Sequence, residues 1–254
     1  NEKPAVIPEL TEWYSTAEQQ GKTFALTEGS RIVCADTALQ SVAQELQKDV
    51  QALFGFQPEI VSDGAQAGDI VLSLESDLPG FDEETYQMTV TEQVELKATD
   101  KVGIYWGTRS VLQALMLSGQ ARTIAQGTAR DYPEFQLRGF MLDVGRKPFS
   151  MDMLQEVVKN MSWFKLNDFH VHLSDNLIFM EDYVDNTDEE GWPNKAWEAY
   201  SGYRLEYTPG EDGKTPASKD YHYSKQEFRN FVEESAALGI NIVPELDVPA
   251  HALA

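Results

Sequence analysis

The chain has 254 residues, and 20 Lys and Arg against 42 Asp and Glu give it a formal net charge of −22. This acidity argues against nucleic-acid binding, which needs clustered Lys and Arg, and no apolar run approaches the roughly 18 residues of a membrane span. The single cysteine, Cys34, excludes a disulfide scaffold within the chain and a cysteine-based metal site.

The first half of the chain predicts a small α+β unit. Apolar residues at helical spacing from Ala38 to Leu53 predict a helix, with Asp36 or Thr37 as its N-cap. A second helix is expected at 108–117, with Gly119 beyond its end. Extended runs separated by turn sequences predict strands at 69–74, 86–90, 94–98 and 102–106. Helices beside several short strands suggest a mostly antiparallel sheet with the helices on one face.

The second half alternates strands and helices. The pattern breaks around 127–133, so we expect a first domain of residues 1–130 and a second of residues 131–254. A strand suited to burial is expected at 137–144, further strands at 167–173 and 240–246, and helices at 151–165 and 224–238. Ser150 is the expected N-cap of the first helix; Ser224 and Glu227 form a capping box on the second, which Gly239 ends. Apolar strands joined by helices predict a parallel sheet with right-handed crossovers.

Three strand–helix units do not complete an architecture, because a (β/α)8 barrel needs more of them. The alternatives are a small open sheet or the front part of a longer protein, and we favour the second. The expected fold class is α/β: an N-terminal α+β domain followed by the first three βα units of a truncated TIM barrel. Such a partial barrel would expose the apolar flanks of its first and third strands.

Ionisable residues stand at the carboxyl end of each predicted strand. They are Asp143 and Arg146 on the first strand, His170, His172 and Asp175 on the second, and Glu245, Asp247 and His251 on the third. The carboxyl ends of parallel strands meet at one edge of a sheet, so the sequence predicts a functional cleft there.

The pair His170 and His172 also suits a metal-dependent barrel hydrolase, which we keep as an alternative. Zinc needs roughly three or four converging ligands, and the only other histidines are His222 and His251. Metal analysis of the purified protein would separate this alternative from an enzyme without a metal.

The segment 183–223 is far longer than the usual connection between a strand and a helix. Its aromatic residues include Trp192, Trp197, Tyr200, Tyr203, Tyr207 and Tyr221. Aromatic rings stack on the apolar faces of sugars, which suggests one wall of a carbohydrate site; packing inside the loop's own core is the alternative for each ring.

Three motifs identify a resemblance to a known family. Residues 138–146 read RGFMLDVGR, residues 165–175 read KLNDFHVHLSD, and residues 243–251 read VPELDVPAH. In order and spacing they resemble glycoside hydrolase family 20, the family of β-N-acetylhexosaminidases and lacto-N-biosidases. The first half of the chain looks like that family's companion domain, so the resemblance covers essentially the whole chain.

The resemblance implies roles for particular residues. Arg138 is expected at the mouth of the first strand, holding hydroxyls of the terminal sugar with its planar guanidinium; an ion pair with the acids of the cleft is the alternative. Asp175 and His251 resemble the pair that supports the catalytic acid and tunes its proton affinity. Asp247 and Asn176 are the other expected substrate-binding residues, although Asp247 matches a position that braces the end of the third strand. His170 and His172 are expected to pack and hydrogen-bond within the barrel.

The family's mechanism is retaining and substrate-assisted. The acetamido oxygen of the substrate attacks the anomeric carbon, while an Asp orients that group and the adjacent Glu protonates the leaving oxygen. This Asp-Glu pair belongs at the end of a fourth strand, so we expect it beyond residue 254 and expect the fragment alone to be inactive. The remainder of the barrel is then an expected partner of this chain.

The resemblance thus implies a glycosidase that removes terminal β-linked N-acetylhexosamine from glycans, at an extracellular or cell-surface location. It implies no metal site and no organic cofactor. Many members have Asp-Asp and Pro-Gly-His where this chain has Asp175-Asn176 and Pro249-Ala250-His251. Both departures resemble the branch that includes lacto-N-biosidases, so release of a disaccharide by the same mechanism is an alternative. A noncatalytic glycan-binding module is another.

Overall fold

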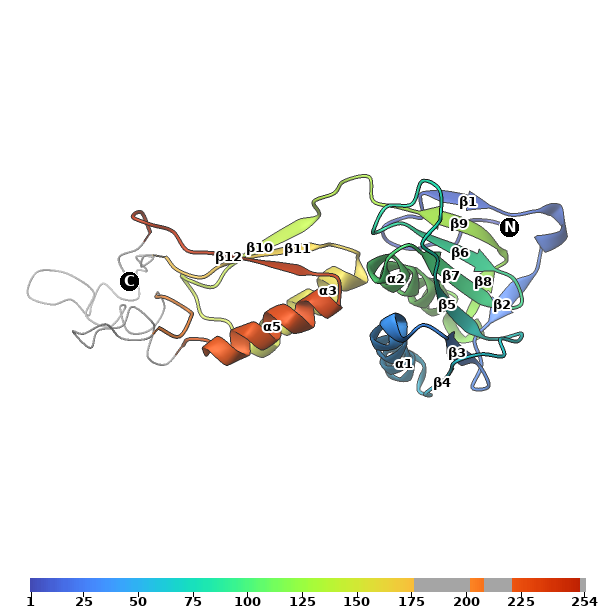
Figure 1. The fold of residues 1–254 in the computed structure, drawn as a ribbon, viewed down its shortest axis with the longest axis horizontal. Coiled ribbons are helices and arrows are strands. Elements are labelled where there is room, and N and C mark those ends of the chain that lie inside the picture. The colour runs from blue at the N-terminus through green and yellow to red at the C-terminus, as the bar shows by residue number, and fades with distance from the viewer. Residues whose placement is uncertain (176–201, 208–220, 252–254) are drawn as a thin grey trace, which may run out of the picture. The chain divides into compact units, whose positions relative to one another are not determined.

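The computed structural model describes residues 1–175, 202–207 and 221–251 and forms two compact units, Asn1–Gln136 and Leu137–Ala254 (Figure 1). The first unit therefore extends to Gln136 rather than to residue 130. The reason is that Gly127–Asp131, where we expected the pattern to break, forms a strand of the first unit's sheet. Among the described residues, no helix combines the length and apolarity needed to cross a membrane.

A seven-stranded sheet with the order β1-β9-β6-β7-β5-β3-β4 forms the first unit. Its strands are β1 (Glu12–Tyr14), β3 (Arg31–Cys34), β4 (Glu59–Val61), β5 (Ile70–Leu74), β6 (Tyr86–Val90), β7 (Val94–Ala98) and β9 (Gly127–Asp131). Strands β2 (Thr23–Ala25) and β8 (Thr123–Ala125) form a separate antiparallel pair.

The expectation of a mostly antiparallel sheet is wrong. The pairs β3–β4, β3–β5 and β5–β7 are parallel, and only β1–β9, β6–β9 and β6–β7 are antiparallel. Helix α1 (Gln40–Phe54) joins β3 to β4, and a helical crossover returns the chain in its original direction. The sheet is therefore mixed.

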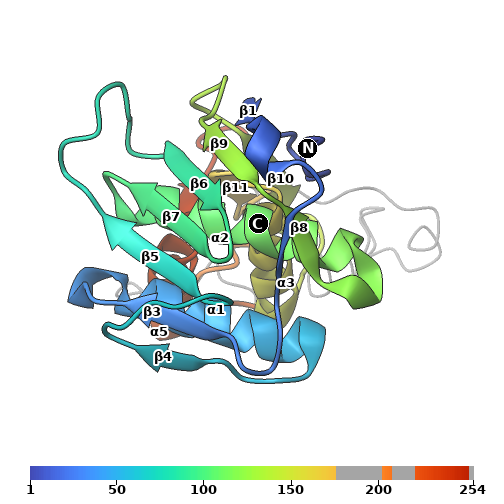
Figure 2. The ribbon, with the colours of Figure 1, turned by 90° about the vertical axis from the view of Figure 1, so that its right-hand side faces the viewer.

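Helices α1 and α2 (Lys101–Leu117) cover one face of this sheet (Figure 2). Asp36 caps a short 3₁₀ turn (Thr37–Leu39) before α1, accepting a hydrogen bond from the Ala38 N–H at 2.8 Å. Two further 3₁₀ turns lie at Ala17–Gln19 and Gly119–Ala121.

The strand expected at 102–106 is also wrong, because these residues form the first turns of α2. The carboxylate of Asp100 accepts from the Val102 N–H at 2.9 Å and caps the helix. Residues 103–115 are all buried, and a short apolar run cannot by itself distinguish a buried strand from a buried helix. Gly103 permits the close approach, since a Cβ there would lie 2.6 Å from the Thr85 carbonyl oxygen.

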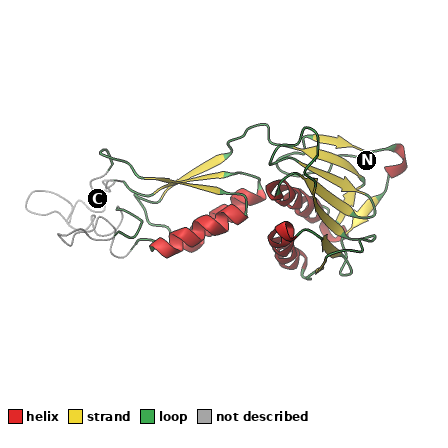
Figure 3. Cartoon of the chain, in the orientation of Figure 1, coloured by secondary structure: helices red, strands yellow, loops and turns green. Residues whose placement is uncertain are grey.

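A three-stranded parallel sheet of β10 (Gly139–Asp143), β11 (Asp168–His172) and β12 (Asn241–Glu245) forms the second unit, as predicted. Helices α3 (Met151–Trp163) and α5 (Lys225–Ala237) lie on one side of it (Figure 3). The capping predictions are confirmed: Ser150 accepts from the Met153 N–H, and Ser224 and Glu227 form a capping box. Gly239 follows α5 with a positive φ of 75°.

Strand β10 is exposed: its apolar run is typical of a buried strand, but the exposure agrees with the expectation for the first strand of a partial barrel. Phe140 and Met141 are 46% and 52% exposed, whereas Phe169 on the central strand β11 is fully buried. In the described part of the chain β10 and β12 are edge strands, so each has a neighbouring strand on one side only.

Candidate functional site

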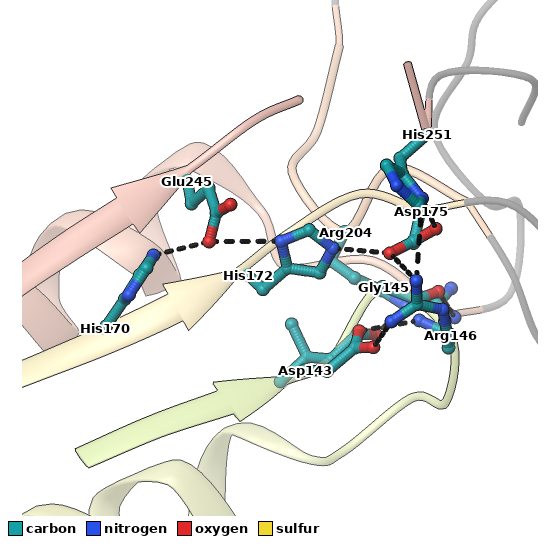
Figure 4. A network of polar contacts seen from close by, with 10 residues as sticks. Asp143, Gly145, Arg146, His170, His172, Asp175, Arg204, Glu245 and His251 are labelled. Carbon is teal, nitrogen blue, oxygen red and sulfur yellow. Dashed lines mark hydrogen bonds and ion pairs between the residues drawn. The ribbon is translucent and has the colours of Figure 1, made fainter. Parts of the chain in front are cut away.

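The carboxyl ends of the three parallel strands bring ionisable side chains together (Figure 4). The register pairs Asp143 with His172 and His172 with Glu245, so the last residues of β10, β11 and β12 lie side by side. Asp175 and Arg146 follow three residues after β11 and β10. The structure therefore brings together, at one edge of the sheet, the ionisable residues that the sequence places at the three strand ends.

Asp175 is the central acceptor of this cluster and is only 1% exposed. Its Oδ2 accepts from His172 Nε2 at 2.7 Å and from Arg146 Nη2 at 2.6 Å, and its Oδ1 accepts from His251 Nδ1 at 2.8 Å. Hydrogen bonds from cationic donors stabilise an ionised carboxylate. Asp175 and His251, predicted as a supporting pair, are thus in direct contact.

Arg146 bridges two strand ends. Its Nη1 lies 2.6 Å from Asp143 Oδ2 and its Nη2 lies 2.6 Å from Asp175 Oδ2. The Arg146 N–H also donates to Asp143 Oδ1 at 3.0 Å, which closes a tight turn after β10. The planar guanidinium is suited to such a bridge because its donors diverge in a fixed fork.

Glu245 and Asp247 complete the cluster at the end of β12. Glu245 Oε2 lies 3.1 Å from His172 Nδ1 and also contacts His170 Nε2. Burial acts to raise the pKa of Glu245, but the contacts with His172 and Asp247 outweigh it and hold the pKa below its ordinary value. Asp247, an expected substrate-binding residue, therefore lies against Glu245 at the predicted edge.

Two groups of these side chains converge closely enough to hold a cation: Asp143 with His172 and Asp175, and His172 with Glu245 and Asp247. In the first group, the Arg146 guanidinium already lies against both carboxylates. Its positive charge already balances these two carboxylates, so the geometry of this first group favours an arginine bridge over a metal ion.

The expected location of Arg138 is wrong. Arg138 immediately precedes Gly139, the first residue of β10, so it lies at the amino end of the strand. Its Nε donates to the Lys165 carbonyl oxygen at 2.8 Å. The motif has an arginine at each end, and the intervening strand separates them by its full length. The chain direction alone indicates that Arg146 is the arginine at the carboxyl edge.

The predicted residues of the connecting segment are only partly among the described residues. Asn176, Trp192, Trp197 and Tyr200 lie outside the described residues. Tyr207 and Tyr221 are described and about half exposed, and Tyr203 is partly buried.

Arg204 is a residue of the site region that sequence reasoning missed. It is 1% exposed, and its guanidinium donates to the carbonyl oxygens of Val144 at 2.6 Å, Gly145 at 3.0 Å and Tyr221 at 3.1 Å. Burial lowers its pKa below the ordinary value. No sequence signal distinguishes this arginine from one in a solvated loop.

Through these hydrogen bonds Arg204 holds the segment 202–207 against the turn that carries Arg146. That turn is closely packed, since a Cβ on Gly145 would lie 2.7 Å from the Ser174 carbonyl carbon and 2.8 Å from the Asp175 nitrogen.

Replacing Arg204 by Lys is expected to lower the free energy of unfolding by about 2–4 kcal/mol, because one ammonium cannot replace the three guanidinium nitrogens that donate to the carbonyl groups of Val144, Gly145 and Tyr221. Denaturant unfolding would measure the loss. Arg229→Lys on the exposed side of α5 is the matched control and should change little. Equal stability of the two variants would contradict the role of Arg204.

The family models match both halves of the chain. "Glycosyl hydrolase family 20, domain 2" matches residues 3–132, and "Glycosyl hydrolase family 20, catalytic domain" matches residues 135–254. A "Beta-hexosaminidase" of Vibrio furnissii is 27% identical over 235 residues, covering 91% of this chain and 36% of the relative. A "Lacto-N-biosidase" of Bifidobacterium bifidum is 24% identical over 251 residues, covering 98% of this chain and 19% of the relative.

A solved structure of Streptomyces plicatus N-acetyl-beta-hexosaminidase has the same fold, with a TM-score of 0.73 at 22% identity. The alignment covers 99% of this chain and 47% of that one. The chain thus spans less than half the length of these relatives. Matches in both halves, in the order of the two family domains, show that the chain belongs to glycosyl hydrolase family 20.

Proposed function

We propose that the full-length protein containing this chain is a retaining, substrate-assisted glycoside hydrolase that removes terminal β-linked N-acetylhexosamine from glycans. The observation that carries the proposal is the buried Asp175 bound to His251 and Arg146 at the carboxyl edge of a parallel sheet. In barrel enzymes this edge forms the active site. Membership of family 20 supports the reaction class.

Asp175, His251 and Arg146 each have a task in this proposal. Asp175 accepts from His251 Nδ1 and so orients a ring that is about half exposed. The other nitrogen of His251 is then available to the carboxylic acid that protonates the leaving oxygen. Arg146 takes the sugar-binding task that the motif suggested for Arg138, because it lies at the carboxyl edge.

The proposal includes the rest of a barrel. Strands β10, β11 and β12 would be its first three strands, and the Asp-Glu pair that orients the acetamido group and protonates the leaving oxygen would come from beyond residue 254. Such an enzyme would meet its glycans outside the cell or at the cell surface, which fractionation of the native protein would test.

Release of a disaccharide is the second candidate. It is favoured by the similarity to a "Lacto-N-biosidase" across 98% of this chain and by Asn176 and Ala250, the departures from the common motifs.

The deciding experiment compares p-nitrophenyl β-N-acetylglucosaminide with p-nitrophenyl lacto-N-bioside as substrates of the full-length protein. Hydrolysis of the first supports a hexosaminidase, and hydrolysis of only the second supports a lacto-N-biosidase. Turnover of neither would contradict the proposed enzyme and favour a glycan-binding module. The isolated 254 residues are expected to turn over neither substrate.

A further inference from the structure

His172 lies at the centre of the cluster, and the proposed function gives it no task (Figure 4). Its side chain is 7% exposed and lies between two carboxylates from different strand ends. Nε2 is 2.7 Å from Asp175 Oδ2, and Nδ1 is 3.1 Å from Glu245 Oε2. The Nδ1 atom is buried and has no aligned hydrogen-bond partner among the described residues, so its contact with Glu245 becomes an ion pair when the ring is protonated.

This geometry favours a particular form of the ring. An ionised carboxylate can only accept hydrogen bonds, whereas a neutral imidazole has a hydrogen on one nitrogen and a lone pair on the other. A neutral His172 would direct its lone pair toward one of the two carboxylates. An imidazolium has a hydrogen on both nitrogens and is attracted to both partners.

The charges around His172 favour the same form. The charged or titratable groups that face it are Asp143, Arg146, His170, Asp175, Glu245 and Asp247. Four of these are carboxylic acids, and Arg146 is the one permanent cation in that set. Burial acts to lower the pKa of His172, but the contacts with Asp175 and Glu245 outweigh it and leave the pKa above its ordinary value.

We propose that His172 is a positioning residue of this site. Its ring stays protonated as an imidazolium and binds both Asp175 and Glu245. In this way it keeps Asp175 ionised and orients the Asp175 carboxylate toward His251. The Oδ2 atom of Asp175 is held by His172 and Arg146, which leaves Oδ1 for His251 Nδ1. Because Oδ1 accepts, His251 keeps its hydrogen on Nδ1 and presents Nε2 as an acceptor.

The effect of this arrangement on turnover rests on the proposed function, whereas the protonation of His172 does not. His172 acts through Asp175 and has no sugar contact in this scheme, so its loss should affect kcat far more than KM.

The first test measures the protonation state of the His172 ring directly. The full-length protein is labelled with ¹⁵N-histidine, and the His172 signals are assigned by their loss in His172→Gln. Both ring nitrogens of His172 should carry a hydrogen at pH 7.5, where an ordinary histidine is neutral. A neutral His172 ring at that pH would overturn the proposal, whether or not the protein is a glycosidase.

The second test uses kinetics on the p-nitrophenyl substrate that the wild type hydrolyses. His172→Gln keeps an N–H donor near Asp175 without the charge, and His172→Phe removes both. We expect kcat to fall about 10-fold in the first and about 100-fold or more in the second, with KM nearly unchanged. His222→Gln, an exposed histidine outside the cluster, is the matched control and should keep wild-type kcat.

A wild-type kcat in both His172 variants, or a loss expressed mainly in KM, would overturn the positioning role. If His172→Phe does not fold, the kinetics of His172→Gln still test the positioning role, and the labelled wild type still tests the protonation of His172. A wild type without glycosidase activity would refute the proposed function and leave the ¹⁵N result to decide the protonation of His172.

The pH dependence of stability gives a third readout. The pKa of His172 is higher in the folded protein than in the unfolded chain, where it is about 6.5. Protonated His172 therefore stabilises the native protein fully below about pH 6.5. This stabilisation is lost as the pH rises through the folded-state pKa. The difference in urea midpoint between wild type and His172→Gln should therefore be larger at pH 6 than at pH 9. A difference that grows toward pH 9 would contradict a charged His172.

Discussion

Asp175→Asn in the full-length protein is expected to lower kcat about 10²- to 10⁴-fold with a much smaller change in KM. The amide is nearly isosteric with the carboxylate, but it has no charge and one of its two terminal atoms is a donor. His172, Arg146 and His251 all direct donors at this group, so at least one of these contacts becomes repulsive. The hydrogen on His251 is then free to shift between its ring nitrogens, and support of the catalytic acid is lost.

Steady-state kinetics on the p-nitrophenyl substrate would measure this change. Asp168→Asn is a matched control on the same strand. Asp168 is the first residue of β11, at the amino end of the strand and away from the cluster, and it accepts from Asn241 Nδ2 at 2.9 Å. Its kcat should stay near the wild-type value. An Asp175→Asn enzyme with wild-type kcat would contradict the assigned role of Asp175.

Arg146→Lys is expected to reduce kcat/KM about 100-fold, mainly through KM. One ammonium cannot hold Asp143 and Asp175, each at 2.6 Å in the native protein, and also donate to a sugar hydroxyl. A lost hydrogen bond to a charged group costs about 1.5–3 kcal/mol, which corresponds to a factor of roughly 10 to 150.

The same kinetics on Arg138→Lys would separate the two arginines of the motif. Arg138 lies at the amino end of β10 and donates to a backbone carbonyl, so its replacement should leave KM nearly unchanged. A large rise in KM for Arg138→Lys, with a normal Arg146→Lys enzyme, would reverse the assignment.

Local patterns predicted the second unit well. The side-chain caps at Ser150 and Ser224 and the left-handed Gly239 depend on a few neighbouring residues, and each is present in the structure. The parallel sheet followed from the alternation of apolar strands and amphipathic helices. The location of Asp175, His251 and Asp247 at one edge followed from the direction of the chain along those strands.

The first unit shows where local patterns were insufficient. An apolar run at 102–106 suits either a strand or a buried helix, and packing of α2 against the sheet on one side and α1 on another decides for the helix. The mixed direction of the strands likewise depends on which strands pair, and pairing is set by contacts between distant parts of the chain.

The sequence by itself determined the family, the order of the elements and the residue types at the carboxyl edge, because motifs, caps and periodicity are encoded by neighbouring residues. Only the tertiary structure decided that Arg146 bridges Asp143 and Asp175, that Arg204 holds the turn carrying Arg146, and that His172 lies between two carboxylates. Each of these depends on distances across strands or loops, which spacing along the chain does not specify. The net charge of −22 described the whole chain, whereas the fold places one of those acids, the buried Asp175, against Arg146 and His172.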